Sequence, residues 1–187
     1  MCTPWAGLVQ ERSSPAHGVH LTDSEFQRLS KAGSAIAFCP TSNLFLGSGL
    51  FNINRAKLTD YPIKVGLGTD IGGGTSLSLL QPANEAYKVT QLQQQNLSSF
   101  KALFLATLGG AQALHLDDTL GNFDIGKEAD FIVLDHRATP LMAYRHAFHI
   151  PESLKELADY AFSLMMMGDD RSVQATYTLG EIVYQRD

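Results

Sequence analysis

The stretch 63–75, which reads Ile-Lys-Val-Gly-Leu-Gly-Thr-Asp-Ile-Gly-Gly-Gly-Thr, constrains the fold more than any other part of the chain. Its apolar run 65–68 is typical of a parallel strand that is buried on both faces. Asp70 follows this run, and the three glycines after it let the backbone turn sharply beside the carboxylate. The carboxyl ends of strands carry the chemistry in (β/α) barrels. Asp70 is therefore a candidate site residue, and the alternative interpretation is a helix N-cap.

The first hundred residues repeat one unit, in which a strand is followed by a loop and a helix. Strands are predicted at 16–21 and 35–39 and before Asp70, so that His17, the loop 39–43 and Asp70 each lie just past a strand. Strands that alternate with helices imply a parallel sheet whose strand ends lie on one face. We therefore expect His17 and Asp70 to face one pocket, which favours a site role for Asp70 over capping.

Local signals set the expected helix boundaries. Thr22 and Glu25 have the spacing of a capping box, and Gly33 is placed to end the helix that follows it. The sequence also predicts a helical stretch at about 52–58 and two longer helices at 77–95 and 98–114.

The last third of the chain has a different pattern. Hydrophobic and polar residues alternate at 129–135 and 174–184, which predicts strands of a small, separate β layer. Between these strands, Pro151 is expected at the first position of an amphipathic helix that ends at Gly168.

Composition narrows the class of protein. The 187 residues are 44% hydrophobic and 18% charged, as in ordinary globular domains, and a complete (β/α) barrel needs about 250 residues. The net charge of -5 argues against nucleic acid and anionic membranes as partners, and no apolar run is long enough for a membrane span. Cys2 and Cys39 make no disulfide framework, which favours a cytoplasmic location.

Several stretches resemble the guanine deaminases of the amidohydrolase superfamily. Gly-Thr-Asp at 68–70 and Gly-Lys-Glu-Ala-Asp-Phe at 126–131 are typical of the superfamily. The glycine loop with Asn-Glu-Ala-Tyr-Lys at 84–88 and Met-Gly-Asp-Asp-Arg at 167–171 resembles the deaminases more narrowly. The resemblance extends to Ala-Phe-Cys-Pro-Thr-Ser-Asn-Leu at 37–44 and to His-Gly at 17–18.

This resemblance implies an α/β fold. The chain would form the C-terminal part of a (β/α)8 TIM barrel, about strands six to eight, and part of a small β-sandwich. His17 would then lie at the end of strand six, Cys39 at the end of strand seven and Asp70 at the end of strand eight. The expected division is a partial barrel at 14–118 and sandwich strands with a C-terminal helix segment at 119–187. Residues 1–13 stay unassigned and are expected to pack loosely.

The resemblance also implies an activity, the zinc-dependent hydrolytic deamination of guanine to xanthine and ammonia in purine catabolism. Asp70 would bind the zinc and accept a proton from the attacking water, and His17 would assist proton transfer and polarise the substrate. Zinc lowers the pKa of a bound water to about 7, and a carboxylate beside that water can then take its proton.

Other parts of the family pattern are absent from the sequence. It has no His-x-His pair, no strand-five histidine with its glutamate, and no arginine motif for holding guanine. Zinc sites of enzymes take three protein ligands, so the zinc site would be incomplete. We therefore expect a C-terminal fragment that is inactive alone and that associates with a complementing N-terminal half or with its own copies. The alternatives are a related amidohydrolase that deaminates or dechlorinates another heterocycle, and a non-catalytic chain that assembles with a partner.

The remaining candidates carry weaker signals. His20 is expected at the surface, and His146 and His149, although spaced for one helix face, are expected in solvent. Cys39 is interpreted as a small buried thiol, since no base stands near it in sequence. The polar pair at 42–43 is a weaker candidate for substrate contact.

Overall fold

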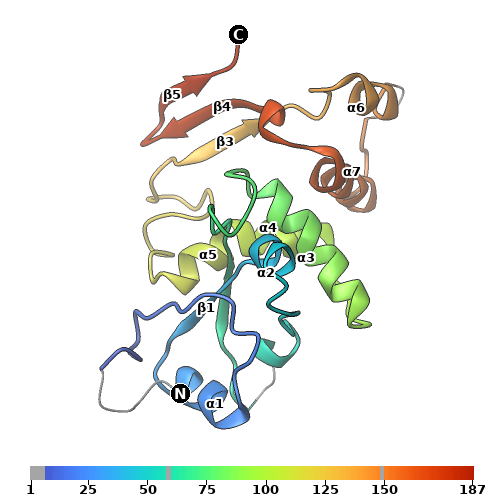
Figure 1. The fold of residues 1–187 in the computed structure, drawn as a ribbon. Helices are drawn as coiled ribbons and strands as arrows, with labels where there is room; N and C mark the ends of the chain where they lie inside the picture. The colour runs from blue at the N-terminus through green and yellow to red at the C-terminus, as the bar shows by residue number, and fades with distance from the viewer. Residues whose placement is uncertain (1–6, 58–59, 148–149) are drawn as a thin grey trace.

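The computed structural model describes residues 7–57, 60–147 and 150–187. Figure 1 shows two separate sheets, with helices gathered between and beside them. The parallel sheet contains β1 (Ala35–Phe38) and β2 (Lys64–Leu67), and the antiparallel sheet contains β3 (Phe131–Leu134), β4 (Val173–Thr178) and β5 (Glu181–Gln185). The helices are α1 (Asp23–Lys31), α2 (Pro40–Phe45), α3 (Leu80–Leu92), α4 (Ser99–Ala106), α5 (Leu108–Ala113), α6 (Pro140–Arg145) and α7 (Leu154–Met167), with 3₁₀ turns at Arg55–Lys57 and Asp170–Ser172.

The parallel sheet has a third, short member, the segment 13–17. The backbone N–H of Ala37 donates to the carbonyl oxygen of Pro15 at 3.0 Å, and the N–H of His17 donates to the carbonyl oxygen of Ala37 at 2.9 Å. The segment therefore pairs with β1 in parallel, and β1 lies between it and β2. The predicted parallel pairing is confirmed. The residues that pair with β1 are 13–17, so most of the expected strand at 16–21 lies after the paired segment.

Helix α1 follows its sequence signals closely. The hydroxyl of Thr22 accepts from the backbone N–H of Glu25 at 3.3 Å, and the Glu25 carboxylate accepts from the N–H of Thr22 at 2.8 Å. Phe26 and Leu29 are buried on the core face of the helix. Gly33 follows the helix with a φ of 71°, the left-handed conformation that ends many helices. The predicted capping box is confirmed.

Three of the sequence expectations for helices are wrong in detail. The polar loop expected at 39–43 is largely the helix α2, with Pro40 at its first position. The helix expected at 98–114 is split into α4 and α5 at Thr107, whose φ and ψ are -126° and -104°. Pro151 does not begin α7, because the hydroxyl of Ser153 accepts from the N–H of Glu156 and caps the helix two residues later.

Of the helix expected at about 52–58, the described residues contain only the 3₁₀ turn Arg55–Lys57, and residue 58 lies outside them.

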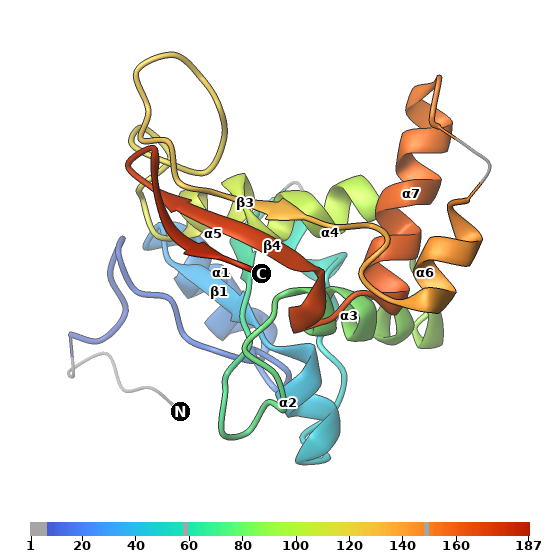
Figure 2. The same cartoon turned by 90° about the horizontal axis from the view of Figure 1, so that it is seen from above.

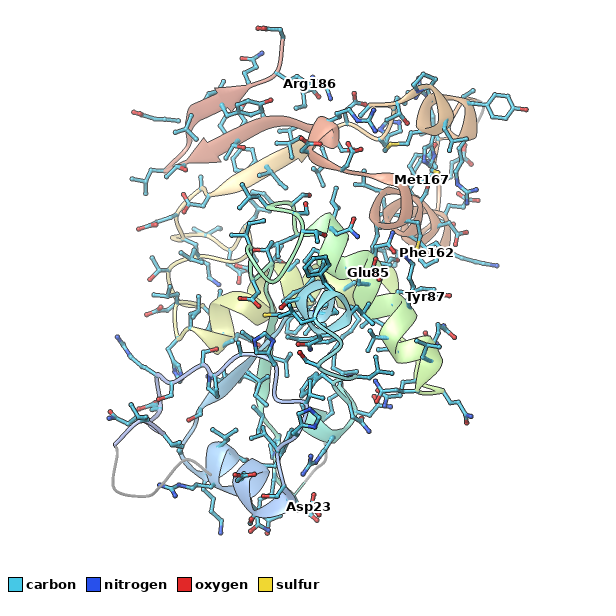
Figure 3. All side chains as sticks on the ribbon, viewed as in Figure 1. Asp23, Glu85, Tyr87, Phe162, Met167 and Arg186 are labelled. Carbon is cyan, nitrogen blue, oxygen red and sulfur yellow. The ribbon has the colours of Figure 1, made fainter. Side chains whose placement is uncertain are left out.

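The main hydrophobic core lies around the parallel sheet and extends to α7. Tyr87 of α3 meets Phe162 of α7 edge to face, with ring centroids 4.9 Å apart (Figure 3). The side-chain amide of Asn84 donates to the carbonyl oxygen of Met166 at 3.0 Å, and Met165 is buried in the core. By its packing, α7 therefore belongs with the helices that precede it in the chain.

The antiparallel sheet lies on the far side of α4 and α5 from α1 (Figures 1 and 2). Leu179 and Gly180 form the tight turn between β4 and β5, with φ angles of 53° and 80°. The Arg186 guanidinium donates to the Asp135 carboxylate at 2.6 Å and fastens the chain end to the sheet. The predicted small β layer is thus present as a separate sheet. Within the described ranges, no helix has the length and apolar character needed to cross a bilayer.

Candidate functional site

His17 and Asp70 meet at the carboxyl ends of their strands. His17 ends the segment 13–17, Asp70 lies three residues after β2, and β1 separates the two strands. The Nε2 atom of His17 is 3.7 Å from the Oδ2 atom of Asp70, and the two side chains are 40% and 38% exposed. A histidine and a carboxylate that lie this close and are both accessible to solvent can exchange protons with a bound molecule. The structure therefore brings together the two residues that the sequence singles out.

Both residues have an uncommon backbone conformation. The φ angle is 71° at His17 and 48° at Asp70, in the left-handed region that side chains with a Cβ atom disfavour. Such residues cost about 1–3 kcal/mol each and are concentrated at functional sites. Backbone hydrogen bonds anchor both residues: the carbonyl oxygen of Asp70 accepts from the N–H of Gly74, and the N–H of His17 donates to the carbonyl oxygen of Ala37.

The glycine loop packs tightly against α2. A Cβ atom at Gly73 would lie 2.6 Å from the hydroxyl oxygen of Ser42 and 3.2 Å from Oδ2 of Asp70. A side chain at this position would therefore displace either α2 or the carboxylate. Gly73 thus has a steric role, because it lets the loop close over the site.

Asn43 is the site residue that the sequence analysis treats only as a weak candidate. Its side chain is 2% exposed, and its Oδ1 atom lies 2.7 Å from Nδ1 of His17. The sequence signal is its place one turn after the end of β1, on the same edge of the sheet as His17 and Asp70. Both residues of the pair at 42–43 are buried, Ser42 beside Gly73 and Asn43 beside His17.

Cys39 is a buried thiol, as predicted. It is 3% exposed, and burial, followed by the negative charge of Asp70, raises the pKa of the thiol to about 11. A thiol with this pKa stays protonated at neutral pH and is a poor nucleophile. Cys39 therefore contributes packing to the site.

Two other histidines of the described residues bond elsewhere in the fold. His20 is exposed, as expected, and its Nε2 atom is 2.8 Å from the carbonyl oxygen of Ser48. The expectation that His146 is solvated is wrong, because it is 3% exposed and its Nε2 atom is 3.0 Å from the hydroxyl of Ser163 on α7. His149 lies outside the described residues.

The residues present do not fit a complete zinc site. Catalytic zinc takes three protein ligands and a water. Among the described residues, no group of three or more histidine, cysteine, aspartate and glutamate side chains is arranged to hold a metal ion. His17 and Asp70 supply two donor atoms, and Asn43 is occupied with His17.

The chain belongs to the amidohydrolase family, whose family model matches residues 8–183. Within that family it is 52% identical over 181 residues to guanine deaminase of Escherichia coli, covering 97% of this chain and 40% of the relative. The chain thus spans about 40% of the length of this relative. The resemblance found in the sequence motifs is confirmed.

Solved structures support the same relationship. The Escherichia coli guanine deaminase structure superposes with a TM-score of 0.89, over 97% of this chain and 41% of that chain. The structure of guanine deaminase from C. acetobutylicum with bound guanine in the active site is 25% identical, with a TM-score of 0.78 over 95% of this chain and 41% of that chain. An adenosine deaminase from Xanthomonas campestris with bound zinc, 24% identical and with a TM-score of 0.73 over 94% and 38%, shares the fold.

The amidohydrolase fold is a TIM barrel, and this chain has an α/β structure with small sheets. The family match begins at residue 8, so residues 8–13, which the sequence leaves unassigned, lie in the matched region. The carbonyl oxygen of Gln10 accepts from the hydroxyl of Ser34 at 2.7 Å, and that of Ser13 accepts from the N–H of Ala35 at 2.9 Å, so this segment is bonded to the fold. Residues 1–6 lie outside the described part of the chain.

Proposed function

We propose that this chain supplies the His17–Asp70 part of the active site of a guanine deaminase, which hydrolyses guanine to xanthine and ammonia in cytoplasmic purine catabolism. The observation that carries the proposal is the 3.7 Å approach of these two side chains in a chain that is 52% identical to the Escherichia coli enzyme. The two residues come from the carboxyl ends of two strands of one parallel sheet, with β1 between them, and TIM-barrel enzymes hold their catalytic groups at such strand ends.

Proton transfer by these two side chains accounts for the chemistry. As water attacks the ring carbon that carries the amino group, its oxygen bonds to that carbon and Asp70 accepts the released proton. The amino nitrogen then takes up a proton as its bond to carbon breaks, and it leaves as ammonia. His17, 3.7 Å from Asp70, lies within reach of the same proton and can pass it to the leaving group.

The proposal assigns zinc to the complete enzyme and makes Asp70 one of its ligands. A bound zinc ion would lower the pKa of a water molecule, so that the water would lose its proton readily near neutral pH. The other ligands and the groups that hold guanine would lie outside this chain, which spans about 40% of its relative.

In the same proposal, residues 14–118 form the strands six to eight of the barrel, and residues 119–187 form sandwich strands together with a C-terminal helix segment. The parallel order of the segment 13–17, β1 and β2 supports the first part, and the separate antiparallel sheet supports the second. The helix α7 follows the boundary in sequence but packs against α3 of the first part.

An ammonia-release assay tests the proposed function. This chain is assayed alone and after joining it to the portion of the Escherichia coli relative that it does not cover. We expect no measurable release from guanine by the chain alone and turnover by the joined enzyme. In the joined enzyme, Asp70→Asn should lower kcat by at least about 10²-fold, as expected for the loss of a general base.

The matched control is Asp118→Asn, which changes an exposed aspartate after α5 and should leave turnover unchanged. Zinc-dependent activity of the 187-residue chain alone would contradict the need for further residues. Full activity of Asp70→Asn would contradict the role of Asp70. A preference for another aminated or chlorinated heterocycle over guanine would favour the related amidohydrolase instead.

A further inference from the structure

Asn43 joins the site from an element that carries neither His17 nor Asp70. It lies in α2, its side chain is 2% exposed, and its Oδ1 atom is 2.7 Å from Nδ1 of His17. This distance is that of a strong hydrogen bond. The opposite nitrogen of the ring, Nε2, is the atom that faces Asp70.

Both backbone polar groups of Asn43 are hydrogen-bonded. Its N–H donates to the carbonyl oxygen of Cys39 at 3.0 Å, and its carbonyl oxygen accepts from the N–H of Ser48 at 2.9 Å. The Nδ2 atom of the side chain is buried and has no hydrogen-bond partner among the described residues. An unpaired buried donor costs about 1–3 kcal/mol, so the bond to His17 is the contact that favours a polar residue here.

An amide oxygen can only accept a hydrogen bond, so Nδ1 of His17 must carry the hydrogen. A neutral imidazole carries one hydrogen, and Nε2 is then a bare lone pair. We propose that Asn43 is a positioning residue that fixes His17 in the Nδ1–H tautomer and directs its Nε2 lone pair into the space beside Asp70.

The tautomer of His17 determines which groups can bind beside His17 and Asp70. Nε2 of His17 and Oδ2 of Asp70 are then two acceptors that lie 3.7 Å apart, with no hydrogen between them. They are complementary to a group with two N–H or O–H bonds, such as a water or a primary amine. This ligand class rests on the proposed function, in which water and the amino group of guanine react at this place, whereas the tautomer itself does not.

The tautomer can be measured directly in the full chain. Nitrogen NMR of chain labelled with ¹⁵N-histidine distinguishes a protonated ring nitrogen from a bare one, at a pH where imidazole is neutral. The His17 signals are assigned by their loss in His17→Gln. We expect Nδ1 to be the protonated nitrogen in the unsubstituted chain, whereas free histidine favours the Nε2–H form.

Two substitutions separate positioning from packing. Asn43→Asp keeps an acceptor oxygen and should retain the Nδ1–H form, whereas Asn43→Leu should shift His17 toward Nε2–H. Asn84→Leu is the matched control, because Asn84 also makes one side-chain bond, to Met166, and also has a buried amide atom without a partner. It should change stability without moving the His17 signals.

Kinetics of the joined enzyme add a second measurement. Asn43→Leu should lower kcat by about 10- to 100-fold, the usual effect of losing a group that orients an active-site histidine, with a much smaller change in KM. Asn43→Asp should recover part of the loss, and Asn84→Leu should show none.

Several outcomes would overturn the proposal. An Nε2–H tautomer in the unsubstituted chain would mean that the Asn43 amide is turned the other way, and this result needs no variant to fold. An unchanged tautomer in Asn43→Leu would show that another group sets it. If the joined enzyme releases no ammonia while the tautomer follows Asn43, the proposed function fails and the positioning role stands.

Discussion

At the scale of single residues, His146 combines burial with a cluster of rings. It follows α6, its Nε2 atom bonds to Ser163 of α7, and its ring lies 4.2 Å from that of Tyr160 and 5.4 Å from that of His136, centroid to centroid. Burial, and then the positive charges of His136, Arg145 and Arg137, lowers the pKa of His146 below its ordinary value. The acidic side chains of Glu156 and Asp159 line the same surface hollow.

This pKa direction predicts how stability depends on pH. Because the folded chain holds His146 with a pKa below that of the unfolded chain, the unfolded state binds more protons between the two values. The contribution of His146 to the free energy of unfolding should therefore be fully present above about pH 6.5 and should be lost as the pH falls further. Urea unfolding at a series of pH values measures this loss.

The control for that series is a pair of substitutions. His146→Gln can still bond to Ser163 but cannot take a charge, so its stability should fall less steeply below about pH 6.5. His20→Gln, which changes an exposed histidine, should keep the slope of the unsubstituted chain. Equal slopes in all three proteins would show that His146 does not become charged on unfolding.

At the scale of elements, β2 and α5 approach each other through two glycines. A Cβ atom at Gly66 of β2 would lie 3.0 Å from the Cα atom of Gly110 in α5 and 3.5 Å from the Cβ atom of Ala113. A Cβ atom at Gly110 itself would have the carbonyl oxygen of Leu105 as its nearest neighbour, at 3.6 Å, which is ordinary contact. A methyl group therefore does not fit at Gly66 of β2, whereas it fits at Gly110 of α5.

Alanine at these two glycines should have opposite effects. Gly66→Ala should lower the free energy of unfolding by about 1–3 kcal/mol, because a backbone has to move to admit the methyl group. Gly110→Ala should raise it by about 0.5–1 kcal/mol, because alanine favours the helix over glycine. Urea unfolding of the two variants measures both effects, and a gain for Gly66→Ala would mean that the strand and helix are not packed this closely.

Elements could be predicted from the sequence where their signals are local. Thr22 with Glu25, and Ser98 before α4, cap their helices with their own side chains, and both starts are predicted correctly. The helix α2 could not be predicted, because its buried side chains after Pro40 are polar while its apolar Leu44 and Phe45 are exposed, and it packs against α3 and the glycine loop. The start of α7 is not fixed by the sequence, because Pro151 and Ser153 both signal a helix start and the structure uses Ser153.

The site divides in the same way. The approach of His17 and Asp70 could be predicted because the end of a parallel strand fixes where the next residue lies. Their roles in catalysis stay predictions. The bond between Asn43 and His17 and the burial of His146 depend on how α2 and α7 pack, and no spacing in the sequence shows either contact.

At the scale of the whole molecule, the parallel sheet has open edges. Within the described part of the chain, no strand pairs with the outer side of the segment 13–17 or of β2. Beside the first of these edges lies a groove of about 460 Å³ between the segment 8–15 and α1. Its apolar lining includes Leu8, Val9, Leu21 and Leu29, and Leu8 is 69% exposed. Parallel strands in α/β proteins are normally covered on both faces, so this side of the molecule has the character of an interface.

We therefore expect the chain alone to associate, either with its own copies or with the complementing N-terminal part of the enzyme. Light scattering after size-exclusion chromatography should show a mass that rises with concentration, and adding the uncovered part of the Escherichia coli relative should replace this with a defined complex. Leu8→Lys places a charge beside the groove and should weaken self-association. Leu92→Lys is the matched control, because Leu92 is similarly exposed, at 71%, but lies at the end of α3, away from the groove residues. A single monomeric mass at every concentration would contradict this expectation, because it would show that the chain stays monomeric with its sheet edges and groove exposed to water.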